Sequence, residues 1–164
     1  MRAVNSIDLL RRRVLRLLGS FGVGAAALPS RAAAPAALVL SEAQWKQRLT
    51  AAQYSVLRED GTERPGSSPL NGEKRAGTYR CVGCDLALFA SATKFDSGTG
   101  WPSFYAALPD ALTTKVDYLL IVPRTAYHCA RCGGHHGHLF GDGPPPTGKR
   151  YCSNGVVLRF VPDA

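Results

Sequence analysis

The sequence has none of the patterns that mark nucleotide-binding enzymes. Strand and helix patterns do not alternate along it and no phosphate-binding glycine motif is present, which argues against a parallel nucleotide-binding sheet. It also has no run of about 20 apolar residues, the length that a helix needs to cross a bilayer. The weakly apolar stretch 17–28 is too short for that and contains three glycines.

Acidic residues are scarce at the N-terminus. Residues 1–36 contain six arginines but a single acid, Asp8, out of 20 basic and 12 acidic residues in the chain. The remainder has 14 basic and 11 acidic side chains, a net charge of +3 against +8 for the whole chain. A nucleic-acid partner would require a clustered basic face, so we expect no such partner.

The arginines near the N-terminus predict an export signal. Residues 10–16 contain paired arginines, a spacer, two apolar residues and a further base, as in a twin-arginine signal. Small-residue cleavage patterns follow the apolar stretch, for example at Ala34-Pro35-Ala36. We therefore predict that residues 1–36 direct the protein to the periplasm or otherwise outside the cytoplasm. No stable membrane insertion is expected after cleavage, although an uncleaved amphipathic anchor is the alternative.

Residues 41–164 are predicted to form one domain. Ser41 and Gln44 fit a capping box, and the apolar spacing after them predicts a helix over 42–52. The polar segment 58–77 is a long connection of the kind that is usually functional. Short strands separated by turn residues are expected at 78–81, 87–89, 118–122, 126–128 and 156–160. The fold class is therefore mainly antiparallel β with a short helical N-terminal region.

Four of the five cysteines form two Cys-x-x-Cys pairs. Cys81 and Cys84 make the first pair, Cys129 and Cys132 the second, and 44 residues separate the pairs. This spacing lets two thiolates of a tight turn bind one metal ion, and two such turns complete a tetrahedral four-sulfur zinc site. We therefore predict one structural Zn²⁺ per chain that joins two distant hairpins.

Disulfide bonds or redox-active dithiols are the alternative use of these four cysteines. An exported protein works in an oxidising compartment, where disulfides form. Two facing pairs are nevertheless more specific for zinc than for disulfides. In either case the odd count leaves one thiol over, that of Cys152.

The remaining thiol, Cys152, lies among residues that could activate it. A thiol is mostly protonated at neutral pH unless cations or hydrogen-bond donors favour its thiolate, and Arg150 and nearby histidines could do so. His135 and His138 are three residues apart, which would place them on opposite faces of a regular strand. Gly137 permits a bulge that turns both toward one pocket. Cysteine with histidine is typical of an activated sulfur nucleophile.

A structural role is the alternative for each of these residues. A single cysteine in a strand-rich segment is often a small core residue, and the histidines could be further metal ligands or polar loop residues. His128 adjoins a zinc cysteine and is better explained as a structural neighbour than as a catalyst. From these residues alone, the sequence predicts a zinc-bound β domain with a reactive thiol and indicates no substrate.

Several motifs in order along residues 41–162 resemble the B-type methionine sulfoxide reductases, which act on the R epimer. These motifs are Gly61-Thr62-Glu63, Ser68-Pro69-Leu70, Gly77-Thr78-Tyr79, Lys94-Phe95-Asp96-Ser97-Gly98, Gly100-Trp101-Pro102-Ser103-Phe104, His135-x-Gly137-His138-x-Phe140, Asp142 to Gly148, and Arg150-Tyr151-Cys152-x-Asn154. The resemblance implies a β-tent-like domain of antiparallel sheets.

The resemblance also implies a role for each site residue. Cys152 would attack the sulfoxide sulfur, while His135 and His138 would position and protonate the sulfoxide oxygen. Methionine would then leave and Cys152 would remain as a sulfenic acid, the first oxidation product of a thiol. A thioredoxin-like or other thiol reductant would restore it.

Four further residues follow from the same resemblance. Trp101 would pack against the methyl group of the substrate, with Phe140 nearby. Arg150 and Asn154 would stabilise the thiolate and organise its loop. The implied activity is repair of oxidised methionine, in proteins and peptides and possibly free, by a monomer.

Three positions depart from the family pattern. Thr99 stands where many members carry a recycling cysteine, so we predict a single-cysteine variant. Gly155 replaces a serine, and His136 replaces a residue that is usually apolar. The rival hypothesis from another class is a non-catalytic zinc-bound β module that recognises a ligand or peptide in the same groove.

Overall fold

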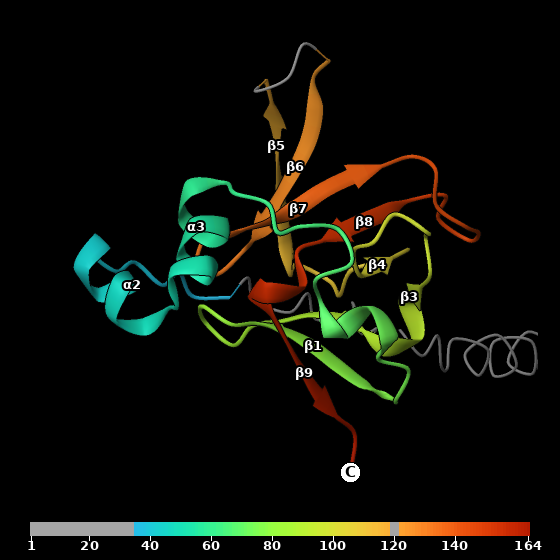
Figure 1. The fold of residues 1–164 in the computed structure, drawn as a ribbon, viewed down its shortest axis with the longest axis horizontal. Helices are drawn as coiled ribbons and strands as arrows, with labels where there is room; N and C mark the ends of the chain where they lie inside the picture. Colours follow the sequence, from blue (N-terminus) through green and yellow to red (C-terminus); the bar gives the residue numbers. More distant parts are fainter. Residues whose placement is uncertain (1–34, 119–121) are drawn as a thin grey trace, which may run out of the picture. The chain divides into compact units, whose positions relative to one another are not determined.

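Two antiparallel sheets dominate the computed structural model, which describes residues 35–118 and 122–164 (Figure 1). The three-stranded sheet has the order β2-β1-β9 and the six-stranded sheet the order β3-β4-β8-β7-β6-β5. Their strands are β1 Gly77–Cys81, β2 Ala87–Ala90, β3 Lys94–Phe95, β4 Ser103–Phe104, β5 Leu112–Asp117, β6 Arg124–Cys129, β7 His135–Phe140, β8 Arg150–Ser153 and β9 Leu158–Pro162. The prediction of a mainly antiparallel β fold is confirmed.

Two helices precede the sheets where the sequence predicted one over 42–52. Helix α2 spans Glu42–Arg48 and α3 spans Ala51–Glu59. The chain breaks between them because Thr50 has extended backbone and caps α3, with a capping box that Gln53 completes. The capping box predicted at Ser41 and Gln44 is present on α2.

Other elements also differ from the prediction. The strand predicted at 118–122 falls largely on residues 119–121, which lie outside the described part of the chain, and β5, Leu112–Asp117, was not predicted. The segment predicted as a strand at 156–160 begins as a 3-10 helix, Gly155–Val157, and becomes β9 only at Leu158. The 58–77 connection contains a 3-10 helix, Pro69–Gly72. The strands predicted at 78–81, 87–89 and 126–128 lie within β1, β2 and β6.

Aromatic side chains join the two sheets in the core. Phe89 of β2 and Phe104 of β4 are fully buried and stack with ring centroids 4.2 Å apart. Tyr127 of β6 meets Phe89 edge to face. Trp45 of α2 and Leu57 of α3 are buried in the same cluster, so the helices close one side of this core.

Strand β7 carries the irregularity that the sequence predicted around Gly137. Gly137 pairs with Tyr127 and His135 with His128, so His136 is an extra residue in the ladder. Gly137 has φ 154°, and a Cβ there would lie 1.9 Å from the carbonyl oxygen of Cys152. Only glycine lets β7 approach β8 this closely.

Most of the predicted export signal lies outside the described residues, which begin at residue 35. The described residues, 35–118 and 122–164, belong to one compact unit. In the described part of the chain, no helix has the length and apolar character needed to cross a membrane.

Candidate active site and metal centre

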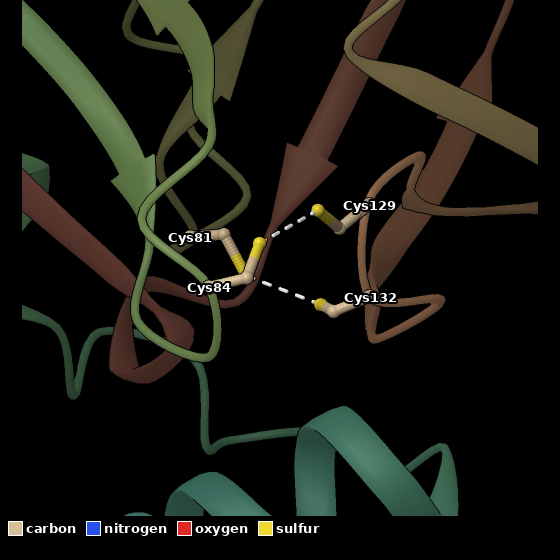
Figure 2. A group of neighbouring side chains, drawn as sticks. All are labelled: Cys81, Cys84, Cys129 and Cys132. Atoms are coloured by element: carbon tan, nitrogen blue, oxygen red, sulfur yellow. Dashed lines mark hydrogen bonds between the residues drawn. The ribbon is translucent and has the colours of Figure 1, made fainter. Parts of the chain in front are cut away.

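The four paired cysteines converge on one point in the interior (Figure 2). Cys81 and Cys84 come from the end of β1 and the turn after it, and Cys129 and Cys132 from the end of β6 and its turn. All four are buried, and their sulfur atoms lie within 4.8 Å of one another. The structure therefore brings together all four predicted zinc ligands.

The sulfur separations fit a metal ion better than disulfides. The Sγ atoms of Cys84 and Cys129 are 3.4 Å apart, and those of Cys81 and Cys132 are 3.7 Å apart. Bonded sulfurs would be about 2 Å apart. Four thiolates at about 2.3 Å from a tetrahedral Zn²⁺ would be separated by about 3.8 Å. The quartet could hold a metal ion, with thiolate chemistry that suits zinc, and it leaves no open position for catalysis.

Cys152 lies directly opposite a histidine in the six-stranded sheet. In the register of β7 and β8, His138 pairs with Cys152 and Phe140 pairs with Arg150. Paired residues point to the same face, so these four side chains share one side of the sheet. The register thus brings the predicted nucleophile next to a predicted acid.

Three of these side chains, those of His138, Phe140 and Cys152, line a small pocket of about 120 Å³. Its lining consists of Thr62, Trp101, Arg124, Gly137, His138, Phe140, Cys152 and Asn154. The two predicted substrate-binding aromatics are both present in it. A larger pocket of about 720 Å³ lies elsewhere, between α3 and β9, and its lining contains neither cysteine nor histidine. We therefore take the smaller pocket as the candidate active site.

Two opposing effects act on the Cys152 thiol. Burial raises its pKa, whereas the Thr99 hydroxyl, with Oγ1 4.0 Å from Sγ, and the Arg150 guanidinium lower it. Arg150 is itself held by two hydrogen bonds that it donates to the Asp142 carboxylate, at 2.8 and 2.9 Å. Its guanidinium stacks 4.2 Å from the centre of the Phe140 ring. Arg150 is thus positioned to stabilise the thiolate.

A carboxylate orients His138. Its Nε2 lies 2.7 Å from Oδ2 of Asp117, and the same oxygen accepts a hydrogen bond from Arg124 at 2.6 Å. Sequence reasoning missed Asp117 and Arg124. Their signal was weak because they act through the pairing of β5 with β6, and β5 is an edge strand whose middle residues are exposed.

His135 lies next to His138, on the side away from the Cys152 pocket. Its ring is 5.3 Å from that of His138, so the bulge does bring both histidines to one side of β7, as predicted. It does not line the Cys152 pocket but a neighbouring one, with His128 and Asp60. Burial lowers the pKa of His135 to about 4, so its ring is neutral at pH 7.

Asn154 ties the loop after β8 to two other segments. Its amide donates to the His136 carbonyl at 3.1 Å, and its side-chain oxygen accepts from the backbone N–H of Glu63 at 3.0 Å. The Glu63 carboxylate accepts from the N–H groups of Gly155 and Val156. Glu63 is a further positioning residue that sequence reasoning did not assign.

Glu63 also holds the tryptophan in place. The Trp101 indole N–H donates to the Glu63 carbonyl at 3.1 Å, which holds the ring against the pocket. At Gly155 an added Cβ would lie 1.9 Å from Oγ of Ser68. Ser68 therefore leaves no room for the serine that the family resemblance led us to expect at position 155. His136 is fully buried, and nothing in the structure explains its imidazole.

Comparison with known proteins identifies relatives of this chain. The SelR domain family matches residues 49–162. A peptide methionine sulfoxide reductase MsrB of Pseudomonas putida is 55% identical over 120 residues, which cover 73% of this chain and 90% of the relative.

Relatives from two other organisms agree with this match. The MsrB of Agrobacterium fabrum is 51% identical over 123 residues, covering 74% of this chain and 91% of the relative. The MsrB of Methanosarcina barkeri is 53% identical over 121 residues, covering 73% of this chain and 85% of the relative.

Proposed function

Since the chain belongs to the SelR family and is a peptide methionine sulfoxide reductase, an oxidoreductase, we propose that it reduces the R epimer of methionine sulfoxide. The proposed reaction proceeds through a sulfenic acid on Cys152. The observation that carries this proposal is the cross-strand pairing of Cys152 with His138. It sets a sulfur nucleophile beside a proton donor in one small pocket.

The reaction divides between these two residues. The Cys152 thiolate attacks the sulfoxide sulfur, and His138, oriented by Asp117, delivers a proton to the sulfoxide oxygen. The sulfur–oxygen bond breaks as oxygen passes to Cys152, which leaves methionine and a cysteine sulfenic acid. Because His138 pairs with Cys152 and lines its pocket whereas His135 lines the neighbouring pocket, we assign the acid to His138, with the His135 ring packed against it.

Trp101 and Phe140 form the apolar part of the pocket, which suits the methyl group of the substrate. Arg124 reaches the same pocket from β6 and keeps Asp117 in place. The substrate we propose is methionine-R-sulfoxide in oxidised proteins and peptides, with the free amino acid as a further substrate. The pocket is small enough to select the sulfoxide group rather than the rest of the residue.

We further propose that the enzyme works with one redox cysteine. Thr99 contacts Cys152 where a recycling cysteine would stand, and the other four thiols converge on the metal centre. An external thiol must then reduce the sulfenic acid: two thiols become a disulfide, and the thiol of Cys152 and water are formed. A thioredoxin-like protein is the proposed donor.

Trapping the intermediate tests this scheme. One equivalent of methionine-R-sulfoxide, added without reductant, should leave a dimedone adduct on Cys152 alone, as seen by mass spectrometry. In Thr99→Cys, the new thiol should capture the sulfenic acid as a disulfide and the adduct should disappear. A disulfide between Cys152 and a cysteine of the metal centre in the unsubstituted protein would contradict the proposal.

The proposed setting is outside the cytoplasm. The paired arginines and apolar stretch of residues 1–36 support export by the twin-arginine route. A reporter fused to residues 1–36 should reach the periplasm. Replacing Arg11, Arg12 and Arg13 by lysine should retain it in the cytoplasm, and unchanged export would rule out this route.

A further inference from the structure

A second cluster of metal-ligand side chains lies beyond His138 on the same sheet. Asp60 ends helix α3, His128 is on β6, and His135 is its partner on β7. Oδ1 of Asp60 is 3.7 Å from Nε2 of His128 and 3.8 Å from Nδ1 of His135. One ligand atom of each residue lies within 4.8 Å of the others.

These separations are too long for hydrogen bonds but suit a shared ion. Ligands at about 2.1 Å from one tetrahedral ion would be separated by about 3.4 Å. The two separations from Asp60 Oδ1 exceed that value by a few tenths of an ångström, and the two histidine ligand atoms lie within 4.8 Å of each other. The arrangement is therefore close to a metal site without any change of backbone.

The buried imidazoles provide an independent reason to expect a ligand. His135 is 1% exposed and His128 is 6% exposed. Both ring nitrogens of His135, and Nδ1 of His128, are buried without a hydrogen-bond partner. Buried polar atoms are almost always satisfied, so these nitrogens call for a group that the protein itself does not supply. A metal ion bound beside Asp60 would satisfy Nδ1 of His135, which lies 3.8 Å from the carboxylate.

An ion can reach this cluster from solvent. The Asp60 side chain is 60% exposed, and the three residues line a pocket of about 220 Å³ together with His138 and Asp117. Lys115 also lines it and opposes a cation, but its side chain is exposed. Weakly binding cations such as Mg²⁺ are therefore poor candidates, whereas two imidazoles and a carboxylate favour the first-row transition metals.

We propose that Asp60, His128 and His135 form a second metal site, separate from the four-cysteine centre, that binds one divalent ion of the Zn²⁺, Co²⁺, Ni²⁺ or Cu²⁺ class. Three protein ligands leave at least one coordination position open toward the pocket. If His135 acts in sulfoxide reduction, an ion here also restrains that residue. This consequence rests on the proposed function, but the binding itself does not.

Titration of the zinc-loaded protein with Co²⁺ tests the proposal. We expect one further equivalent to bind with weak visible bands and without the intense thiolate-to-metal absorption of a cysteine site. Asp60→Asn should weaken this binding at least tenfold, because it removes the carboxylate but retains a residue that tolerates the left-handed backbone at φ 54°. His128→Gln should weaken it similarly.

Asp110→Asn is the matched control. Asp110 is also exposed and left-handed, at φ 53°, but lies outside the cluster, so its variant should bind Co²⁺ as the unsubstituted protein does. Three results would each overturn the proposal: no second equivalent, thiolate bands for that equivalent, or equal affinity in Asp60→Asn. Each can be read whether or not the protein reduces sulfoxides.

Discussion

Single residues set the reactivity of the Cys152 thiol. Burial disfavours its thiolate, and Thr99 and Arg150 counteract that effect, so its pKa stays above the ordinary value. The resting enzyme therefore holds mostly the thiol at neutral pH. Only the small fraction of Cys152 that is present as thiolate can attack. Protonation of the sulfoxide oxygen by His138 is therefore the more important, because it makes the sulfoxide easier to attack.

Alkylation of Cys152 should report this balance. Its rate with iodoacetamide should rise with pH through the raised pKa, since only the thiolate reacts. Arg150→Met should move the midpoint to higher pH and slow alkylation severalfold at neutral pH, because the favourable cation is lost. Arg48→Met, on the exposed face of α2, is the control and should change nothing. An unshifted profile in Arg150→Met would refute this role of the guanidinium.

The sequence predicted part of this residue network. The cysteine quartet was predictable because metal binding by a tight turn requires a fixed local spacing. Asp117 and Arg124 were not, since they act through a cross-strand register that no local pattern encodes. The hydrogen bond between Asn154 and Glu63 was likewise not predictable, because the two residues are about ninety positions apart in the sequence.

Among the elements, the bulged strand β7 determines the shape of the site. The extra residue at His136 turns His135 and His138 to one side, and Gly137 allows β7 to contact the backbone of β8 at Cys152. The position of the nucleophile therefore depends on a glycine that touches no substrate.

Gly137→Ala should show this dependence. The added methyl group would clash with the Cys152 carbonyl, so we expect the free energy of unfolding to fall by about 2 kcal/mol or more, with loss of activity. Gly141→Ala, just after the same strand, has open space around its Cβ and should be neutral. Denaturant unfolding measures both, and equal stability of the two variants would contradict the account.

Elements with strong local patterns were predicted better than those without. Strands β1, β2 and β6 were found because each carries buried apolar or aromatic residues, although the burial alternates only in β1. Strand β5 was missed because it is stabilised by pairing with β6 rather than by apolar burial. The break between α2 and α3 was readable in Thr50 and Gln53, a second capping box that the helical spacing of the apolar residues obscured.

At the scale of the whole described domain, the metal centre connects the two sheets. One cysteine pair follows β1 of the three-stranded sheet, and the other follows β6 of the six-stranded sheet. The stacked pair of Phe89 and Phe104 makes a second connection through the core. An ion held by these four cysteines would support the sheet that carries Cys152 without taking part in the reaction.

Removal of the ion should weaken the whole domain. Chelation of this site should lower the Tm by about 10 °C or more, because structural zinc contributes directly to folding. Cys81→Ser should lose one metal ion per chain and show a similar fall, whereas Cys152→Ser should keep both metal content and Tm. Metal analysis and thermal unfolding measure these outcomes. A Tm that is unchanged after complete removal of the metal would contradict the structural role.

The separate reduction of the two methionine sulfoxide epimers by the zinc-loaded protein, with dithiothreitol as reductant, tests the central claim most directly. The account predicts turnover of the R epimer alone, and its loss in Cys152→Ser with the metal still bound. Turnover of the S epimer, or R-epimer activity that survives in Cys152→Ser, would contradict it.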